Sequence, residues 1–173
     1  VAAGSEDAKL VALPLGQNVA TAQHYDVARA ADCLQKAGFS DRLARMPKGL
    51  DTCLYKDLDE DGVTISGGEA QKIAIARALY KDAPFIVLDE PTAALDPVAE
   101  AEIYAKFNEI AGDKTAIYIS HRLSSCKFCD EIAVFDHGEV VQQGTHEELL
   151  GEPDGKYYEL WNAQAQYYTE ESA

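Results

Sequence analysis

Basic side chains are scarce in this sequence. It contains 15 Lys and Arg residues against 30 Asp and Glu residues, which gives a formal net charge of −15. Because binding to DNA or RNA depends on clusters of Lys and Arg, this balance argues against a nucleic-acid partner. It leaves nucleotide binding open, since a bound phosphate needs only a few backbone N–H groups and one or two cations.

Long hydrophobic runs are also missing. No stretch approaches the ~18 consecutive apolar residues that a membrane-spanning helix needs. The longest clean run, Phe85 to Leu88, has the length of a strand. Hydrophobic residues nevertheless make up 47% of the 173 residues, which is enough for the core of about one ordinary globular domain.

The sequence has few cysteines, and their spacing does not form a disulfide framework. They are Cys33, Cys53, Cys126 and Cys129. The last two make a lone CxxC, whereas a zinc ribbon needs a second pair, and neither His121 nor His137 lies at a suitable spacing to replace it. We therefore interpret the four cysteines as packing residues of a protein from a reducing compartment.

The first half of the chain is predicted to be mostly helical, because its apolar residues recur at helical spacing. The expected segments are an irregular entry over residues 1–16, a helix through Val27 and Leu34 that ends near Gly38, a short helix between Ser40 and Pro47, an acidic loop over 48–62, and a helix from Ser66 to about Tyr80.

The second half alternates strands and helices, which predicts a parallel α/β sheet. The continuous apolar runs at 85–88 and 115–120 are typical of strands covered on both faces. Asp96 and Pro97 open a helix that ends at Gly112. Two further strands are expected at 132–135 and 139–142 around an Asp-His-Gly turn, followed by a capping box at 145–148 and a final amphipathic helix around Trp161.

Ser66-Gly67-Gly68-Glu69 stands directly before one of the best helical patterns. The S-x-x-E pattern fits a capping box, which explains the Ser and the Glu but not two consecutive glycines. Glycines remove side chains and let another group approach the exposed N–H groups, where the helix dipole favours an anion. A helix cap and a phosphate site are compatible, so the residues predict both.

Two acids, Asp89 and Glu90, follow the apolar run at 85–88. Ligands of open α/β sheets bind beyond the carboxyl ends of the strands. One carboxylate there can hold Mg²⁺, and the other can orient or deprotonate a water molecule. The alternative is a strand that runs into a solvated turn. His121 follows the second run in the same way and can contact a phosphate there, although a lone histidine is more often structural.

Read together, "ISGGEAQKIAIARAL", "FIVLDEPTAALD" and "SHR" resemble, in this order, the signature sequence, the Walker B strand with the D-loop, and the switch histidine of the ATP-binding cassette (ABC) ATPases. "KLVALPLGQNV", "GEVVQQGTHEELL" and "KYYELWNAQ" are similar to segments of ABC exporters, so the resemblance covers nearly the whole chain. It implies an α/β fold, with a partial P-loop NTPase-type core of parallel strands and an α-helical subdomain.

The resemblance also implies roles for individual residues. Asp89 serves Mg²⁺ as the Walker B carboxylate, Glu90 is the catalytic base, and His121 contacts the γ-phosphate. Asp96 belongs to the D-loop, which meets the opposing subunit. The signature residues, which cap the γ-phosphate of ATP held by that subunit, are Ser66, Gly67, Gly68 and Glu69.

Two features depart from the family pattern. The sequence has no Walker A loop; the nearest match, residues 151–156, has the wrong spacing, follows no strand, and has Tyr157 in place of Ser or Thr. We therefore expect the chain alone to bind MgATP poorly and to hydrolyse it negligibly. The Q-loop glutamine is also missing. Glu6 occupies its place, unless Gly4 and Ser5 are a remnant of cloning, and we do not take Glu6 as a site residue.

These observations predict the C-terminal part of the nucleotide-binding domain of an ABC exporter. Residues 1–16 would be a remnant of the Q-loop region or a cloning linker, 17–80 the helical subdomain, and 81–173 the distal half of the ATPase core. The expected partners are a second nucleotide-binding domain and a transmembrane permease on the cytoplasmic side of the membrane.

Two rival functions stay open. The first is the C-terminal lobe of a chromosome-maintenance or DNA-repair ABC ATPase, although the sequence shows neither long heptad segments nor basic patches. The second is an inactive binding module, against which the presence of Asp89, Glu90 and His121 argues.

Overall fold

The computed structural model describes residues 2–5, 9–57, 59–95, 100, 103, 112 and 114–170, with the backbone alone for 2–5 and 166–170. The chain divides into two compact units, Val1–Ile119 and Ser120–Ala173, and each unit is described by itself. The helix predicted to open at Asp96 lies outside the described residues for most of its length.

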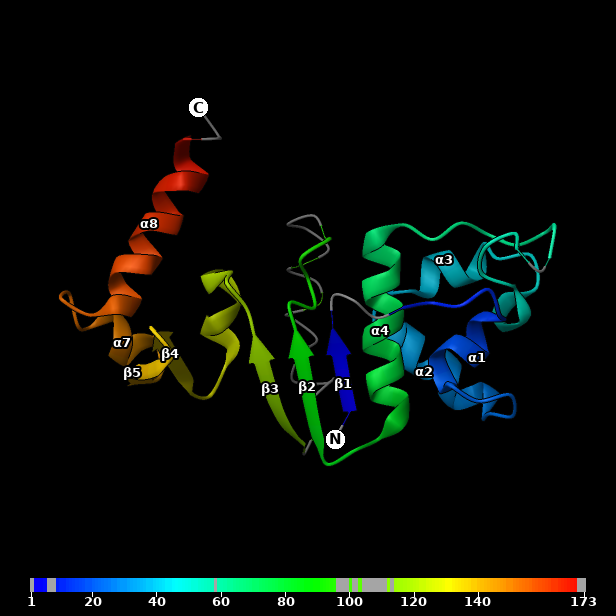
Figure 1. Cartoon of the computed structure of the whole chain (residues 1–173), viewed down its shortest axis with the longest axis horizontal. Helices are drawn as coiled ribbons and strands as arrows, with labels where there is room; N and C mark the ends of the chain where they lie inside the picture. The colour runs from blue at the N-terminus through cyan, green and yellow to red at the C-terminus, as the bar shows by residue number, and fades with distance from the viewer. Residues whose placement is uncertain are drawn as a thin grey trace. The chain divides into compact units, whose positions relative to one another are not determined.

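The first unit contains a three-stranded parallel sheet (Figure 1). Its strands are β1 (Ala2–Ser5), β2 (Phe85–Asp89) and β3 (Thr115–Ile119), in the order β1-β2-β3. The parallel arrangement confirms the predicted fold class. β1, however, forms where the sequence predicts an irregular entry. Its four residues have little β propensity of their own, so the strand depends on pairing with β2, where Ala3 lies opposite Val87.

The helices of the first unit follow the predicted pattern with two additions, a short helix at 15–20 and a 3₁₀ turn at 49–51. They are α1 (Leu15–Ala20), α2 (Val27–Lys36), α3 (Ser40–Ala44), the 3₁₀ turn η1 (Gly49–Asp51) and α4 (Gly67–Lys81). The side chain of Asp26 accepts a hydrogen bond from the backbone N–H of Arg29 and so caps α2. α2 is followed by Gly38 with a φ of +72°, a conformation that favours glycine.

Helix α4 lies between the sheet and the group of α1, α2 and α3 (Figure 1). Because it has neighbours on opposite sides, apolar residues surround it instead of forming one stripe: Ile73, Ile75 and Ala76 are at most 2% exposed. On β2, Ile86 and Leu88 face this same core and are also buried.

The other face of the sheet carries exposed apolar side chains, which corrects the expectation of strands covered on both faces. Phe85 is 47% exposed, Ile117 51% and Ile119 49%. Val87 pairs with Ile117, and Asp89 with Ile119, so these side chains lie on one face. A continuous apolar run is the pattern of two covered faces, yet among the residues that the structure describes the core packs against one of them.

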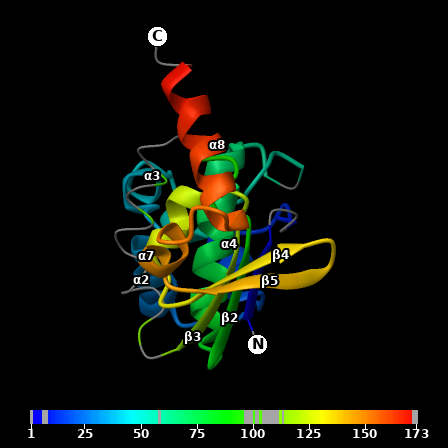
Figure 2. The same ribbon diagram turned by 90° about the vertical axis from the view of Figure 1, so that its left-hand side faces the viewer.

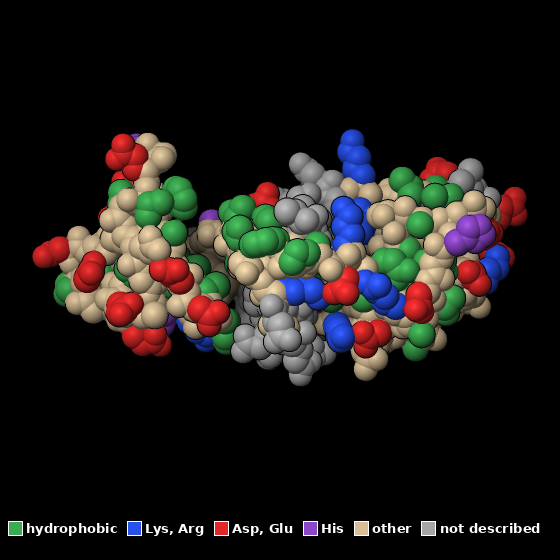
Figure 3. Space-filling view, turned by 90° about the horizontal axis from the view of Figure 1, so that it is seen from below, with side chains coloured by type: hydrophobic (Ala, Val, Ile, Leu, Met, Phe, Trp, Pro, Cys, Tyr) green, Lys and Arg blue, Asp and Glu red, His purple; other side chains and the backbone are tan. Residues whose placement is uncertain are grey.

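Ion pairs gather where α4 ends. Asp82, the C-cap of α4, lies 2.7 Å from Lys114 Nζ and 3.7 Å from the guanidinium of Arg29. The hydrogen bond from Lys114 and the positive charge of that lysine hold the pKa of Asp82 below its ordinary value. Figure 3 shows basic and acidic side chains lying next to one another on this face. These exposed pairs tie the start of β3 to the end of α4 only weakly.

The second unit is built on an antiparallel hairpin (Figure 2). Its elements are the 3₁₀ turn η2 (Leu123–Phe128), β4 (Ile132–Asp136), β5 (Glu139–Gly144), α7 (His146–Leu150) and α8 (Lys156–Glu170). His137 and Gly138 connect the strands with φ values of +47° and +84°, which form a tight turn where the sequence predicts one around Asp-His-Gly. A small core includes Ile132, Leu149 and the fully buried Tyr157.

None of the helices among the described residues is long and apolar enough to cross a membrane.

Candidate functional site

The N-terminus of α4 has the predicted capping box. The backbone N–H of Glu69 donates to Ser66 Oγ at 3.2 Å, and the backbone N–H of Ser66 donates to Glu69 Oε2 at 2.9 Å. Ser66 and Gly67 are exposed. A rigidly started helix of 15 residues therefore presents its positive dipole end to solvent, which is a favourable place for an anion.

Glu69 is engaged by local partners through both carboxylate oxygens. While Oε2 closes the capping box, Oε1 lies 2.8 Å from Arg42 Nε, an ion pair that joins α3 to α4. Arg42 also donates to the carbonyl oxygen of Thr64 at 3.2 Å. Arg42 thus offsets the negative charge of Glu69 at the helix start. The sequence pattern gave no signal for it, because α3 and α4 meet only in the folded chain.

The two glycines of the signature stretch lie against the segment that follows β2. A Cβ atom on Gly68 would stand 3.1 Å from the carbonyl oxygen of Ala94 and 3.2 Å from Leu95 Cδ2, closer than side chains normally pack. On Gly67 it would stand 3.4 Å from Ala94 Cβ, an ordinary contact. Gly68 therefore allows the close packing of helix and loop, in addition to any role in admitting a phosphate.

Asp89 ends β2, and Glu90 begins a turn over residues 90–95. Asp89 is exposed and Glu90 half-buried. Glu90 has a φ of +46°, a left-handed conformation that costs a non-glycine residue roughly 1–2 kcal/mol. Its N–H donates to the carbonyl oxygen of Ile119 at 2.9 Å, and its own carbonyl accepts from the N–H of Ala93 at 3.1 Å. The predicted carboxylates thus stand on a strained, hydrogen-bonded turn.

Gln71 of α4 also holds the 90–95 turn. Its Nε2 donates to the carbonyl oxygen of Glu90 at 3.3 Å, and its Oε1 accepts from the N–H of Ala94 at 2.9 Å. Elsewhere in the turn, Thr92 donates its hydroxyl hydrogen to Glu100 Oε1 at 3.1 Å. Sequence reasoning missed Gln71, since a single glutamine on a helix carries no signal of what it contacts.

Within the first unit, the structure places Gly67 and Gly68 of the signature against the 90–95 turn, which begins directly after Asp89. His121 belongs to the second unit, so its predicted place beside those carboxylates remains a prediction. There its backbone carbonyl accepts a hydrogen bond from the side-chain amide of Gln164. Asp96 and Glu6 lie outside the described residues.

Asp89 and Glu90 are better suited to a metal ion that arrives bound to a ligand than to a metal ion held by the protein alone. Among the residues that the structure describes, no group of three or more His, Cys, Asp or Glu side chains could hold a metal. Mg²⁺ commonly binds through one or two carboxylates and takes its remaining ligands from phosphates and water. The exposed carboxylate of Asp89 suits that mode of binding.

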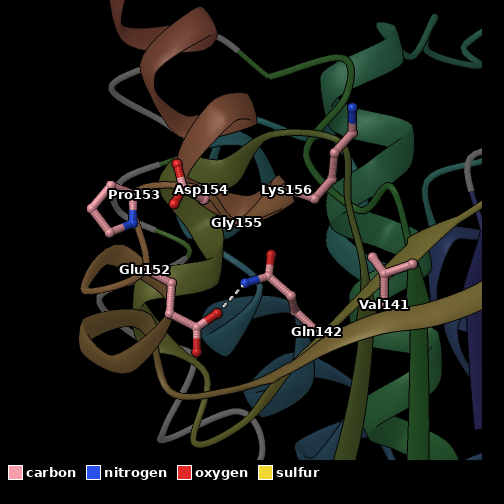
Figure 4. Close-up of a pocket in the computed structure, with 7 residues that line it drawn as sticks. All are labelled: Val141, Gln142, Glu152, Pro153, Asp154, Gly155 and Lys156. Carbon is pink, nitrogen blue, oxygen red and sulfur yellow. Dashed lines mark hydrogen bonds between the residues drawn. The ribbon is translucent and has the colours of Figure 1, made fainter.

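The loop that distantly resembles a phosphate-binding loop forms a different kind of hollow. A pocket of about 520 Å³ lies beside residues 152–156 (Figure 4). Gln142 donates to Glu152 Oε2 at 2.5 Å there, and Lys156 pairs with Glu159 at 2.9 Å. With Glu152 and Asp154 in its lining, the pocket does not suit a phosphate. This result agrees with the prediction that residues 151–156 are not a Walker A loop.

The CxxC cysteines belong to the second unit. All four cysteines are free, and Cys126 and Cys129 are half-buried. Burial raises the pKa of both thiols, that of Cys129 to about 11. Because the thiolate is the reactive form, burial disfavours reaction at these thiols near neutral pH, and the packing role remains a prediction.

Comparison with known proteins finds a matching family and similar transporters. The family model described as "ABC transporter" matches residues 9–93. The chain is 42% identical over 147 residues to the mitochondrial iron-sulfur clusters transporter ABCB7 of Oryzias latipes, covering 85% of this chain and 18% of that protein. It is 43% identical over 155 residues to the ATP-dependent lipid A-core flippase of Idiomarina loihiensis, covering 87% of this chain and 25% of that protein.

A solved structure is also similar. A bacterial Atm1-family ABC exporter with ATP bound superimposes with a TM-score of 0.82 at 33% sequence identity, covering 95% of this chain and 28% of that one. The chain therefore spans only about a fifth to a quarter of the length of the relatives described above.

Proposed function

We propose that this chain supplies the residues that carry out hydrolysis at an ATP site. The chain belongs to the ABC transporter family, as part of a nucleotide-binding domain of the exporter type. In the complete protein, that site would couple ATP hydrolysis to transport across a membrane. The transported substrate would be set by the permease, so this chain does not determine it.

One observation carries the proposal: the N-terminus of α4 and the carboxylates after β2 border the same 90–95 turn. An anion-favouring helix start and a pair of acids are opposite electrostatic environments, and a MgATP complex has a group suited to each. The exposed N–H end of α4 suits the terminal phosphate of a nucleotide held by the opposing domain, and Asp89 suits the metal ion of the nucleotide in this chain's own site.

Each residue then has a distinct task. Bound MgATP would supply the electrophilic terminal phosphorus and the metal charge that stabilises the leaving group. Asp89 would hold the metal side of the complex, and Glu90 would accept a proton from the attacking water. His121 would donate a hydrogen bond to the terminal phosphate, and Asp96 would contact the opposing domain across the D-loop.

The signature residues would act on a nucleotide held chiefly by a second nucleotide-binding domain. Ser66, Gly67 and Gly68 would receive its terminal phosphate at the N-terminus of α4, and Glu69 would support them by holding Ser66 and Arg42 in place. Since the 173 residues contain no GxxxxGK[ST] loop to hold the other phosphates, the chain alone should bind MgATP weakly and turn it over negligibly.

The permease would dock where the entry segment meets the helical subdomain, at a hollow of about 580 Å³ lined by Arg77 and by residues between 9 and 23. Val11 and Leu13 at its edge are 50% and 41% exposed. Their backbone is fixed by the buried side chain of Asn18, which accepts from the N–H of Val11 and donates to the carbonyl oxygens of Val11 and Leu13, each at 3.0 Å. A rigid segment with exposed apolar side chains suits a permanent protein contact on the cytoplasmic side of the membrane.

The test replaces Glu90 by Gln in the complete transporter. Because the amide keeps the shape of the carboxylate but accepts no proton, ATP binding should persist while kcat falls by about 10²-fold or more. Turnover close to that of the wild type would remove Glu90 from the proposed role. A parallel calorimetric titration of this chain alone with MgATP should give no detectable binding.

A further inference from the structure

Glu69 places a negative charge in the first turn of the helix that is proposed to receive a phosphate. Its carboxylate stands at the third position of α4, where Oε2 accepts a hydrogen bond from the backbone N–H of Ser66. A neutral glutamine can fill the same place in a capping box. The charge of Glu69 favours the helix itself, because the N-terminal end of the helix dipole is positive, but it opposes the approach of a second anion to the same N–H groups.

Arg42 brings a positive charge to the same helix start. Its Nε lies 2.8 Å from Glu69 Oε1, and its guanidinium also donates to the carbonyl oxygen of Thr64 at 3.2 Å. The side chains of Arg42 and Glu69 are 34% and 25% exposed, so salt screens this pair less than it screens a fully exposed one. The guanidinium therefore lies beside residues 64–69, through which the chain enters α4.

We propose that Arg42 determines how tightly the signature end of α4 binds the terminal phosphate of a nucleotide held by the opposing domain. By pairing with Glu69, Arg42 cancels the charge of that carboxylate, so the dipole of α4 stays attractive to an anion. This inference rests on the proposed function. It concerns the nucleotide of the opposing domain, whereas Asp89 and Glu90 belong to this chain's own site.

A charge role and a bridging role of Arg42 predict different orders of affinity. If charge decides, the affinity follows the summed charge of residues 42 and 69: neutral in wild type, negative in Arg42→Met, positive in Glu69→Gln, and neutral again in the double variant. If the ion pair serves only to join α3 to α4, all three variants lose it, and all three should bind more weakly.

The experiment measures association of the nucleotide-binding domains in the complete transporter by cross-linking, with Mg²⁺ and a non-hydrolysable ATP analogue as the probe. Methionine replaces Arg42 because it keeps an apolar stem and removes the charge. Arg45→Met is the matched control, since Arg45 is exposed at the end of the same helix and its Nε donates to the carbonyl oxygen of Asp41 at 3.0 Å. Chemical denaturation reports the folding of each variant separately.

We expect Arg42→Met to raise the analogue concentration for half-maximal association by about 10-fold, because it leaves an uncompensated carboxylate near the phosphate. Glu69→Gln should lower that concentration, and the double variant should return it to within about twofold of wild type. Arg45→Met should match wild type. Since Glu69→Gln leaves Arg42 in place, it tests the role of charge in a variant that keeps the arginine.

Two results would overturn the inference. Folded Arg42→Met protein with wild-type association would show that Arg42 does not act on the phosphate. A double variant as weak as Arg42→Met would reduce the pair to a bridge between α3 and α4. Both results leave the proposed function intact, whereas a wild-type transporter that neither associates with the analogue nor hydrolyses ATP would overturn that function, and the inference with it.

Discussion

The carbonyl oxygen of Ala94 lies 3.1 Å from the position where a Cβ atom on Gly68 would stand. Gly68, the second signature glycine, thus packs closely against the turn after β2, independently of any ligand. The glycine pair has two requirements to meet, one from the neighbouring turn and one from the proposed phosphate. The requirement from the turn falls on Gly68 and not on Gly67, because only Gly68 of this pair is tightly packed against the turn.

Replacing Gly68 by Ala should therefore destabilise the first unit, and the same change at Gly67 should not. Alanine is the better helix former by about 1 kcal/mol, which favours both variants. At Gly68, overpacking against Ala94 and Leu95 opposes that gain by about 1–3 kcal/mol. Chemical denaturation of the two variants measures the difference, and equal stabilities would mean that the turn moves away without cost.

Most of the secondary structure could be predicted because its signals are local. The capping boxes at Ser66 and Thr145 and the turn at His137 and Gly138 each depend on residues within four positions of one another. The candidate carboxylates were found in the same way, since acids directly after an apolar strand can be recognised from the sequence alone.

What sequence reasoning missed depends on contacts between distant segments. Strand β1 forms only by pairing with β2, and its residues carry no strand pattern of their own. Gln71 and Arg42 gain their importance from partners on other elements, the 90–95 turn and Glu69 respectively. The open face at Phe85 and Ile117 differed because periodicity reports which residues are apolar, not whether a second layer covers them.

The two capping boxes offer a matched pair of mutations. Ser66→Ala and Thr145→Ala each remove the side chain that accepts the N–H at the third helical position, so each should cost about 1 kcal/mol of stability. Only Ser66 belongs to the proposed phosphate site. In the complete transporter, Ser66→Ala should therefore weaken ATP-driven association of the nucleotide-binding domains while Thr145→Ala leaves it unchanged, as measured by ATP-dependent cross-linking. Equal effects of the two variants would reduce Ser66 to a helix cap.

The apolar residues at the edge of the hollow, Val11 and Leu13, allow a test of the proposed permease contact. Asp in place of Val11 or Leu13 places a charge where an apolar contact with the permease is proposed, while the exposed positions cost the fold little. ATP hydrolysis by the transporter should persist and its stimulation by transported substrate should fall. The control is Val27→Asp on α2, 62% exposed and outside the hollow, which should keep its stimulation. Loss of stimulation in the control as well would point to a general effect of charge on the helical subdomain.

The buried CxxC gives the stability of the second unit a dependence on alkaline pH. Burial, with lesser contributions from Cys126 and Asp130, raises the pKa of Cys129 from 9.0 to about 11, so folding favours the neutral thiol. Because the folded pKa is the higher one, this stabilisation is fully present below about pH 9 and is lost as the pH rises towards 11.

Denaturation of the chain between pH 8 and pH 11 should therefore show stability falling through this range. Cys129→Ala should flatten that part of the profile, although Cys126 and Tyr157, whose pKa values are also raised by burial, keep some dependence. Alkylation by iodoacetamide at pH 8 should be slow at Cys129 in folded protein and fast after unfolding, because only the thiolate reacts. Fast alkylation in the folded state would contradict the packing role and reopen the CxxC as a reactive site.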